Sequence, residues 1–249
     1  MATPKLEKLY EDDDVVVINK PAGLLTIPDR YQARLPNMRD ILKEQYGSIF
    51  VVHRLDRETS GAIIFAKNAE AHKNLNDQFE HHTVKKIYHT VVSGIVSQDE
   101  MAIDIPLAPD PVKKGLVRPS ARGKEALTTI RVLERYRMAT FLECNLHTGR
   151  QHQIRVHCAA IGYPLLVDEN YAGTSEFMLS SIKKKFNLAK HTEEKPLISR
   201  LTLHAYSLTF KHPSTEEEIS VVAPYPKDFR ALLNSLGKYA TYKTTFKKF

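Results

Sequence analysis

The segment His53-Arg54-Leu55-Asp56 places an imidazole, a guanidinium and a carboxylate within four residues, and the turn-forming Thr59-Ser60-Gly61 follows closely. The apolar run from Ile49 to Leu55 predicts a strand, so these side chains would stand at a strand end, firmly held yet accessible. The flanking arginines favour the charged form of Asp56. A positioned, ionised carboxylate can act as a nucleophile or a base. A surface ion pair beside an Asp-initiated turn is the alternative.

A second charged segment, Arg150-Gln-His-Gln-Ile-Arg-Val-His157, predicts a helix that begins near Thr148. Thr148 and Gln151 fit a capping box. Arg155 lies at the border of the apolar face of this helix, and a half-buried arginine needs an anionic partner. Asp56 would suit it, whereas a side chain that extends its charged end to solvent is the alternative.

The same segment argues against a metal centre. His152 and His157 are five residues apart, which is the wrong spacing for the zinc pair of H-E-x-x-H, and no carboxylate stands at the matching place. The sequence also lacks the glycine-rich motifs of phosphate loops and dinucleotide sites and the nucleophile elbow of α/β-hydrolases. We therefore expect no metal and no nucleotide cofactor.

Tyr88 opens a predicted strand just after Lys85-Lys86. An aromatic side chain there either stacks on a nucleic-acid base or packs as a half-buried strand residue, and the residues alone leave both open.

The overall charge indicates a polyanionic partner. Lys and Arg outnumber Asp and Glu by 36 to 29, and the isoelectric point is about 9.2. The two cysteines, Cys144 and Cys158, cannot form a disulfide framework. Neither a secretory signal nor an apolar run long enough to span a bilayer is present, so we expect a cytoplasmic protein without a membrane partner.

The elements that must position these residues follow one another irregularly, with strands mostly followed by strands. This order predicts an α+β fold around a mixed or antiparallel sheet, forming one domain over residues 1–249 with a frayed tail at 238–249. Residues 104–125 predict an extended loop, and residues 174–200 a polar, Lys-rich surface excursion. Strands are predicted at 15–19, 49–55, 62–66, 88–94, 126–134, 139–145 and 203–211, and helices at 38–46, 68–79, from about 148 to 161, and 228–236.

Several blocks, in order, resemble the RluA-type RNA pseudouridine synthases. His53-Arg-Leu-Asp-Arg-Glu-Thr-Ser-Gly61 is similar to the family signature H-R-L-D-x-x-T-S-G. Thr148-Gly-Arg-Gln-His-Gln-Ile-Arg-Val-His157, with Ile161-Gly-Tyr-Pro164 and Asp168-x-x-Tyr171, is similar to a second block. Val17-Ile-Asn-Lys-Pro-Ala-Gly23, Gly123-Lys-Glu-Ala126 and Leu203-His-Ala205 resemble further family segments, so the resemblance runs from about residue 11 to 235.

The resemblance implies the pseudouridine synthase fold and an isomerase that detaches uracil from ribose, turns it and rejoins it through carbon 5, without metal or cofactor. It implies that Asp56 acts on a flipped-out uridine and that Arg54 helps to displace the nucleotide. Tyr88 would stack under the uracil and take the proton from carbon 5, and Arg155 would keep Asp56 charged. The substrate-contacting residues it implies are His53, Arg54, Lys20, Arg150 and Gln153.

The partner expected from this resemblance is rRNA or tRNA, bound by a monomer that lacks the small N-terminal RNA-binding domain of many relatives. Two other functions compete. A non-catalytic RNA-binding factor in ribosome assembly explains charge and aromatic residues equally well, but not an intact Asp56 and Arg155. A metal-dependent nuclease predicts clustered carboxylates, which the motifs lack.

Overall fold

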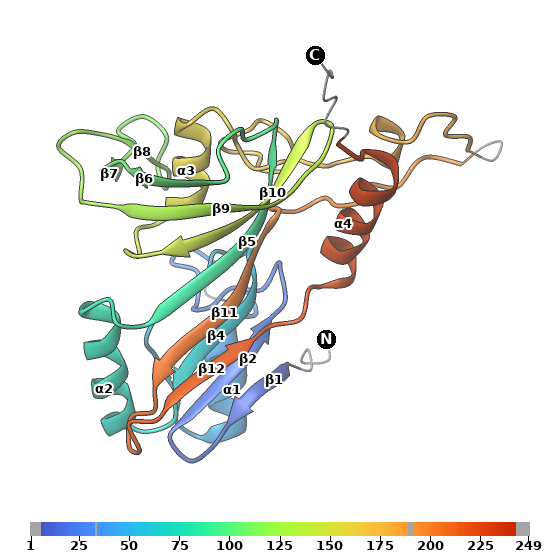
Figure 1. The fold of residues 1–249 in the computed structure, drawn as a ribbon. Helices are drawn as coiled ribbons and strands as arrows, with labels where there is room; N and C mark the ends of the chain where they lie inside the picture. The colour runs from blue at the N-terminus through green and yellow to red at the C-terminus, as the bar shows by residue number, and fades with distance from the viewer. Residues whose placement is uncertain (1–5, 33, 189–191, 243–249) are drawn as a thin grey trace. The chain divides into compact units, whose positions relative to one another are not determined.

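The computed structural model describes residues 6–32, 34–188 and 192–242 (Figure 1). The chain divides into two compact units, residues 1–88 with 145–148 and 203–225, and residues 89–144 with 149–202 and 226–249. The predicted single domain over residues 1–249 stays a prediction. Strands are β1 Glu7–Glu11, β2 Val15–Lys20, β3 Phe50–Val51, β4 Ser60–Ala66, β5 Lys85–Ser93, β6 Glu100–Asp104, β7 Leu107–Pro109, β8 Val117–Pro119, β9 Leu127–Arg135, β10 Ala139–Leu146, β11 Leu203–Lys211 and β12 Glu218–Val222; helices are α1 Met38–Tyr46, α2 Ala69–Glu80, α3 Gln153–Ala160, the short 3-10 helix η1 Leu179–Ser181 and α4 Lys227–Tyr239.

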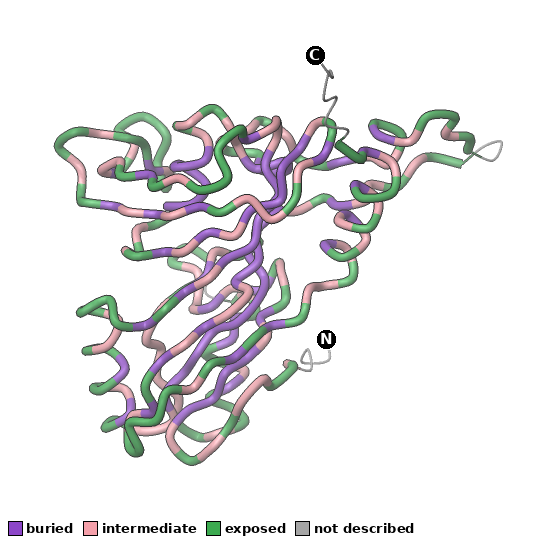
Figure 2. Tube along the Cα trace, in the orientation of Figure 1, coloured by how far each residue is buried: buried purple, intermediate pink, exposed green. Residues whose placement is uncertain are grey.

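The first unit is built on strands in the order β1-β2-β4-β11, with β3 paired to β4 and β12 paired to β11. All of these pairs are antiparallel except β4 with β11, which is parallel. Every residue of β4 is buried, so this strand lies at the centre of the unit (Figure 2). α2 packs its apolar residues Ala71 and Leu75 into the same core.

The second unit has the strand order β5-β10-β9-β6, with a separate β7-β8 hairpin. β5 belongs to both units, since Tyr88 is the last residue of one and His89 the first of the other. α4 buries Phe229, Leu232 and Leu236. No helix within the described ranges is long and apolar enough to span a bilayer.

The predicted α+β fold with a mixed, mostly antiparallel sheet is confirmed by these pairings. The predicted helix at 38–46 and the predicted strand at 203–211 have the observed bounds. The strand predicted over 49–55 is wrong beyond Val51, because the chain then leaves the sheet. The extended loop predicted over 104–125 contains the β7-β8 hairpin. β1, β6 and β12 were not predicted.

The predicted capping box at Thr148 is also wrong. α3 begins at Gln153, and its N-cap residue His152 has the left-handed backbone of φ 54° and makes no side-chain cap bond. The tail predicted from residue 238 is ordered at its start. Lys238 and Tyr239 belong to α4, Ala240 is buried, and Thr241 bridges to Tyr136, while residues 243–249 lie outside the described ranges.

Candidate active site

Residues 53–59 form the loop that carries Asp56, called the Asp56 loop from here on. The loop leaves the sheet at His53. The Ile64 amide of β4 donates to His53 Nε2 at 3.2 Å, so a side chain accepts the hydrogen bond that a neighbouring strand would otherwise accept. The imidazole also stacks on Phe79 of α2, with ring centroids 4.5 Å apart. The structure therefore gives His53 a positioning contact at the start of this loop.

The His53 ring is neutral, because the Ile64 amide requires an unprotonated Nε2. Withdrawal from water lowers its pKa to about 3, and the nearby Lys86 adds a smaller effect in the same direction. Burial also lowers the pKa of Lys86. Protonation of His53 would break the link between the loop and β4.

We expect acid to destabilise the protein through His53. Below pH 6.5, the ordinary pKa of histidine, His53 binds a proton in the unfolded chain but not in the folded chain. The free energy of unfolding therefore falls as the pH falls. The loss between pH 6.5 and 4 is at most about 3 kcal/mol, since each pH unit contributes ~1.4 kcal/mol. Urea unfolding over this range should show a shallower pH dependence in His53→Gln. Equal slopes in the two proteins would contradict the assignment.

Lys20, the last residue of β2, holds the backbone of the Asp56 loop through its side chain. Lys20 is fully buried, and its Nζ donates to the carbonyl oxygens of Pro21 at 3.0 Å and of Arg57 at 2.8 Å. The Gly23 amide donates to the same Arg57 oxygen at 2.9 Å, and Arg57 Nε donates to the Gly23 oxygen at 3.0 Å. The side chain of Lys20, which was predicted to contact substrate, thus fixes the backbone of this loop.

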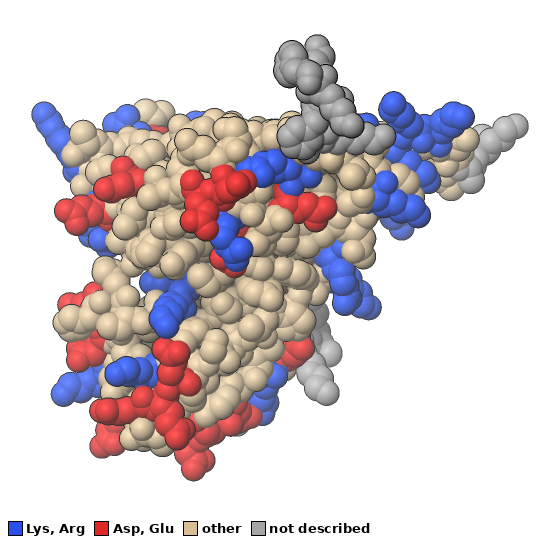
Figure 3. Space-filling model, in the orientation of Figure 1, with Lys and Arg blue, Asp and Glu red and all other residues tan. Residues whose placement is uncertain are grey.

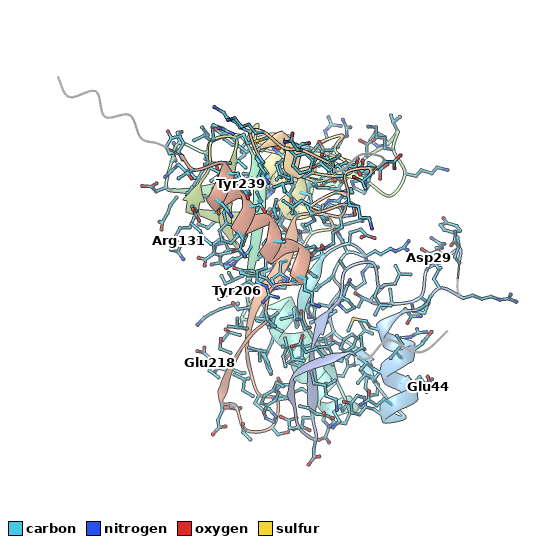
Figure 4. The ribbon with its side chains drawn as sticks, turned by 90° about the vertical axis from the view of Figure 1, so that its right-hand side faces the viewer. Asp29, Glu44, Arg131, Tyr206, Glu218 and Tyr239 are labelled. Carbon is cyan, nitrogen blue, oxygen red and sulfur yellow. The ribbon has the colours of Figure 1, made fainter. Side chains whose placement is uncertain are left out.

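A second fastening comes from Thr26, which sequence reasoning missed. Its hydroxyl donates to the Leu55 carbonyl oxygen at 3.0 Å and accepts from the Leu55 amide at 3.2 Å. Thr26 is buried, so these two bonds replace the water that would otherwise satisfy Leu55. Thr26 lies on the segment between β2 and α1 that also contains Asp29, labelled in Figure 4. A threonine within an apolar run carries no sequence signal for such a role.

We expect Thr26→Val to lower the kcat of the isomerase reaction that the resemblance implies about tenfold, with little change in KM. The reason is that a displaced Leu55 moves the neighbouring Asp56 carboxylate away from the position in which it would meet the nucleotide. The variant also leaves the amide and the carbonyl of Leu55 without a partner, which costs about 1–3 kcal/mol of stability. Single-turnover kinetics and thermal unfolding measure the two effects. Thr26→Ser keeps the hydroxyl and should restore kcat; a Ser variant as slow as Val would argue against the clamp.

Asp56 itself is half-buried, and its carbonyl oxygen accepts from the Thr59 amide at 3.1 Å to close a tight turn. Its charge reaches Tyr88, whose pKa is raised first by burial and second by Asp56. Tyr88 is 8% exposed. The structure therefore brings the predicted carboxylate and the predicted tyrosine into electrostatic contact, with the tyrosine neutral. Arg54 is exposed.

The far end of the motif is fixed by β11. Ser60 and Gly61 pair with His204 and Ala205 in the parallel ladder. His204 Nε2 lies 3.1 Å from the Ala223 carbonyl oxygen and therefore donates, so its Nδ1 accepts from the Ser60 hydroxyl at 2.9 Å. All of these contacts keep the strand that follows Asp56 in one register.

In the second unit, Arg155 has an anionic partner in Asp168, a residue that the sequence did not single out for this pairing. Arg155 Nε and Nη2 donate to the two Asp168 carboxylate oxygens at 2.7 and 2.8 Å, and both side chains are buried. Asp168 also accepts from the amides of Asn170 and Tyr171. The Tyr171 ring lies 4.9 Å from the guanidinium carbon. This pairing occupies one edge of a guanidinium that has five N–H groups. The predicted pairing of Arg155 with Asp56 stays a prediction.

Gln153 and Arg150, both predicted to contact RNA, differ in exposure. Gln153 is buried; its Nε2 donates to the Leu127 oxygen at 3.0 Å and to Thr128 Oγ1 at 2.9 Å, and its Oε1 accepts from the Arg150 amide at 2.9 Å. These bonds tie α3 to β9. Arg150 is partly exposed, and its Nε donates to the Glu125 carbonyl oxygen at 2.9 Å. Arg150 thus remains near solvent, whereas Gln153 shapes the helix start.

Comparison with known proteins identifies the family. A family model for RNA pseudouridylate synthases matches residues 14–160, which include Asp56, Tyr88 and Arg155. The chain belongs to the RNA pseudouridylate synthase family. Human RNA Pseudouridylate Synthase Domain Containing 4 superposes with a TM-score of 0.68 at 24% identity, covering 93% of each chain, and so has the same fold.

Two bacterial relatives place the chain with the RluA-type members. Ribosomal large subunit pseudouridine synthase D of Neisseria meningitidis is 37% identical over 244 residues, covering 93% of this chain but only 61% of that protein. Dual-specificity RNA pseudouridine synthase RluA of Pasteurella multocida is 37% identical over 226 residues, covering 89% of this chain and 94% of that protein. The chain therefore spans about three fifths of the longer relative, and the RluA-type resemblance is confirmed.

Proposed function

We propose that this protein isomerises uridine to pseudouridine in structured RNA, with Asp56 as the essential carboxylate. The observation that carries the proposal is the Asp56 loop, whose backbone is fastened by Lys20 and Thr26 while the carboxylate itself stays half-buried. Preorganisation of this kind is what a nucleophile or a base requires. A protein that only binds RNA does not require a carboxylate held in this way.

The reaction conserves atoms and electrons. The bond from ribose carbon 1′ to uracil N1 breaks, a bond from carbon 1′ to carbon 5 forms, and the proton of carbon 5 is exchanged for one on N1. A uridine inside a helix is out of reach and must first be flipped out, which costs a few kcal/mol. Asp56 either attacks the nucleotide or removes the proton that starts elimination. No step requires a metal or a redox cofactor.

Tyr88 is a neutral phenol in the free protein, since burial and the charge of Asp56 both raise its pKa. Stacking under the flipped uracil requires no ionisation, and we propose this as its first role. If Asp56 bonds to the substrate, its charge is lost and the smaller of the two effects that raise the pKa of Tyr88 is removed, while burial remains. The neutral phenol then takes the proton of carbon 5 while it releases its own, and uracil N1, which gains a proton in the reaction, is the final acceptor. The two proposed roles therefore belong to successive stages of one reaction.

The other arginines serve the nucleotide and the carboxylate. Arg54 is exposed beside Asp56, which suits the displacement of the target nucleotide. We propose that Arg155 keeps Asp56 charged, as the family resemblance implies, and the fixed pairing with Asp168 would hold the guanidinium in one rotamer for that task. Arg150 supplies a further cation for RNA, while His53, Lys20 and Gln153 act by positioning.

The proposed substrate is rRNA or tRNA, since relatives are named for the large ribosomal subunit and for dual specificity. We expect a monomer that acts in the cytoplasm without a nucleotide cofactor. The purified protein should convert uridine in unmodified transcripts of large-subunit rRNA or of tRNA, with EDTA present, as detected by carbodiimide-dependent reverse-transcription stops. Binding without any conversion, in both RNAs and in RNA from cells lacking the gene, would favour the non-catalytic assembly factor.

A further inference from the structure

We propose that four lysines on the second unit form a separate surface for RNA phosphates, outside the catalytic residues. This surface, called the lysine ridge, consists of Lys183, Lys184, Lys185 and Lys238. The proposal rests on the proposed function, since it names a surface of the second unit that binds the phosphates of the same RNA.

The ridge is built on a folded segment and not on a loose loop. Within residues 174–200, Phe177 and Ile198 form a bridge, with the Phe177 amide donating to the Ile198 oxygen at 2.8 Å. Phe177, Ile182 and Ile198 are all buried. The 3-10 helix η1 ends just before the three consecutive lysines, and the Lys183 amide donates to the Leu179 carbonyl oxygen at 3.0 Å. The sequence predicted a polar surface excursion here, but it has an apolar base.

The end of α4 joins the same surface. Lys183 Nζ lies 5.6 Å from the centre of the Tyr239 ring and 5.9 Å from that of Phe186, and Lys238 Nζ lies 5.3 Å from the Tyr239 centre. Figure 4 labels Tyr239 on α4. Arg137 also bonds to the end of this helix, since its backbone amide donates to the Ala240 carbonyl oxygen at 2.7 Å. Two segments far apart in sequence thus hold their lysines around one aromatic ring.

Positive charge exceeds negative charge on this segment. Residues 174–200 contain six Lys and Arg residues against three Glu. In the part of the chain that the structure describes, none of the four ridge lysines forms an ion pair, whereas Arg200 is paired with Asp228. Lys184, Lys185 and Lys238 are exposed, and Figure 3 shows blue side chains gathered over this segment and α4.

Unpaired, exposed ammonium groups on a fixed base attract phosphates through charge alone. Lysine is a point charge that does not read bases, so the ridge would add affinity and orientation without sequence preference. Each phosphate contact releases condensed cations, which makes the binding weaken steeply with salt. An RNA backbone therefore fits the ridge better than an apolar protein partner.

The test compares two triple variants that lose the same charge. Lys184→Gln, Lys185→Gln and Lys238→Gln removes the three exposed lysines of the ridge, and Lys43→Gln, Lys73→Gln and Lys211→Gln removes three exposed lysines of the first unit. The dissociation constant for an unmodified large-subunit rRNA transcript is measured from 0.05 to 0.3 M KCl. We expect the ridge variant to bind about tenfold more weakly at 0.1 M salt, with a log–log slope shallower by about two. Its kcat at saturating RNA should stay within twofold.

Each outcome decides something. Equal slopes and affinities for the ridge variant and the wild type would overturn the proposal, as would an equal loss in the control variant, which would show a general effect of net charge. Wild-type binding that depends on the ridge without any conversion of uridine would leave the ridge standing and refute the proposed reaction. A wild type that binds no RNA would refute both. Thermal unfolding of both variants checks that they fold.

Discussion

Asp56→Asn should abolish pseudouridine formation, with a fall of roughly 10⁴-fold or more in the single-turnover rate. The amide has nearly the shape of the carboxylate but can neither attack the nucleotide nor accept its proton. The fastenings of the Asp56 loop grip backbone atoms of Leu55 and Arg57, so they survive the change. RNA affinity should therefore stay within about threefold, since the phosphate contacts are untouched.

The matched control for this experiment is Asp13→Asn, which removes an exposed carboxylate of the same unit. It should leave the rate unchanged within twofold. Conversion at the full rate by Asp56→Asn would refute the catalytic role, and loss of binding together with conversion would point to a role in holding RNA. Mass spectrometry of digested transcripts gives the rate, and filter binding gives the affinity.

Gly61→Ala should unfold the protein or cost at least about 4 kcal/mol, because there is no room for a side chain. A Cβ on Gly61 would lie 2.2 Å from the Ala205 carbonyl oxygen, and that backbone is held in the parallel ladder of β4 and β11. The backbone angle φ of +116° adds strain for any L residue. Chemical denaturation, or recovery of soluble protein, measures the effect.

Gly47→Ala separates the two causes. Gly47 also has a positive φ, +77°, but no atom lies within 4 Å of a Cβ built there. It ends α1, and its replacement should cost only about 1–2 kcal/mol. Equal losses at positions 47 and 61 would mean that backbone angle, not the contact with Ala205, makes Gly61 necessary.

Local patterns predicted the elements whose own residues determine them. α1 has a polar cap at Asn37 and a glycine at its end, and the apolar periodicity between them gives the observed bounds. α3 shows the limit of this reasoning. Thr148 and Gln151 have capping-box spacing, but Gln153 bonds instead to Leu127 and Thr128 of a distant strand and sets the helix start.

The sequence predicted which residue types the candidate site contains, but not which residues they contact. A half-buried arginine at position 155 indicated an anionic partner, yet only the fold shows that Asp168 fills this role. Thr26 had no signal, because its function depends on a hydroxyl meeting a backbone 29 residues away. Such pairings depend on tertiary structure, which a single sequence does not display.

The fastenings described for Leu55 and Arg57 act largely on main-chain atoms, and this has an evolutionary consequence. The side chain of Glu58 is exposed and takes no part in these bonds, so substitutions at position 58 can accumulate without displacing the backbone around Asp56. Evolution can therefore vary the exposed rim of the loop while the backbone that carries Asp56 keeps its position.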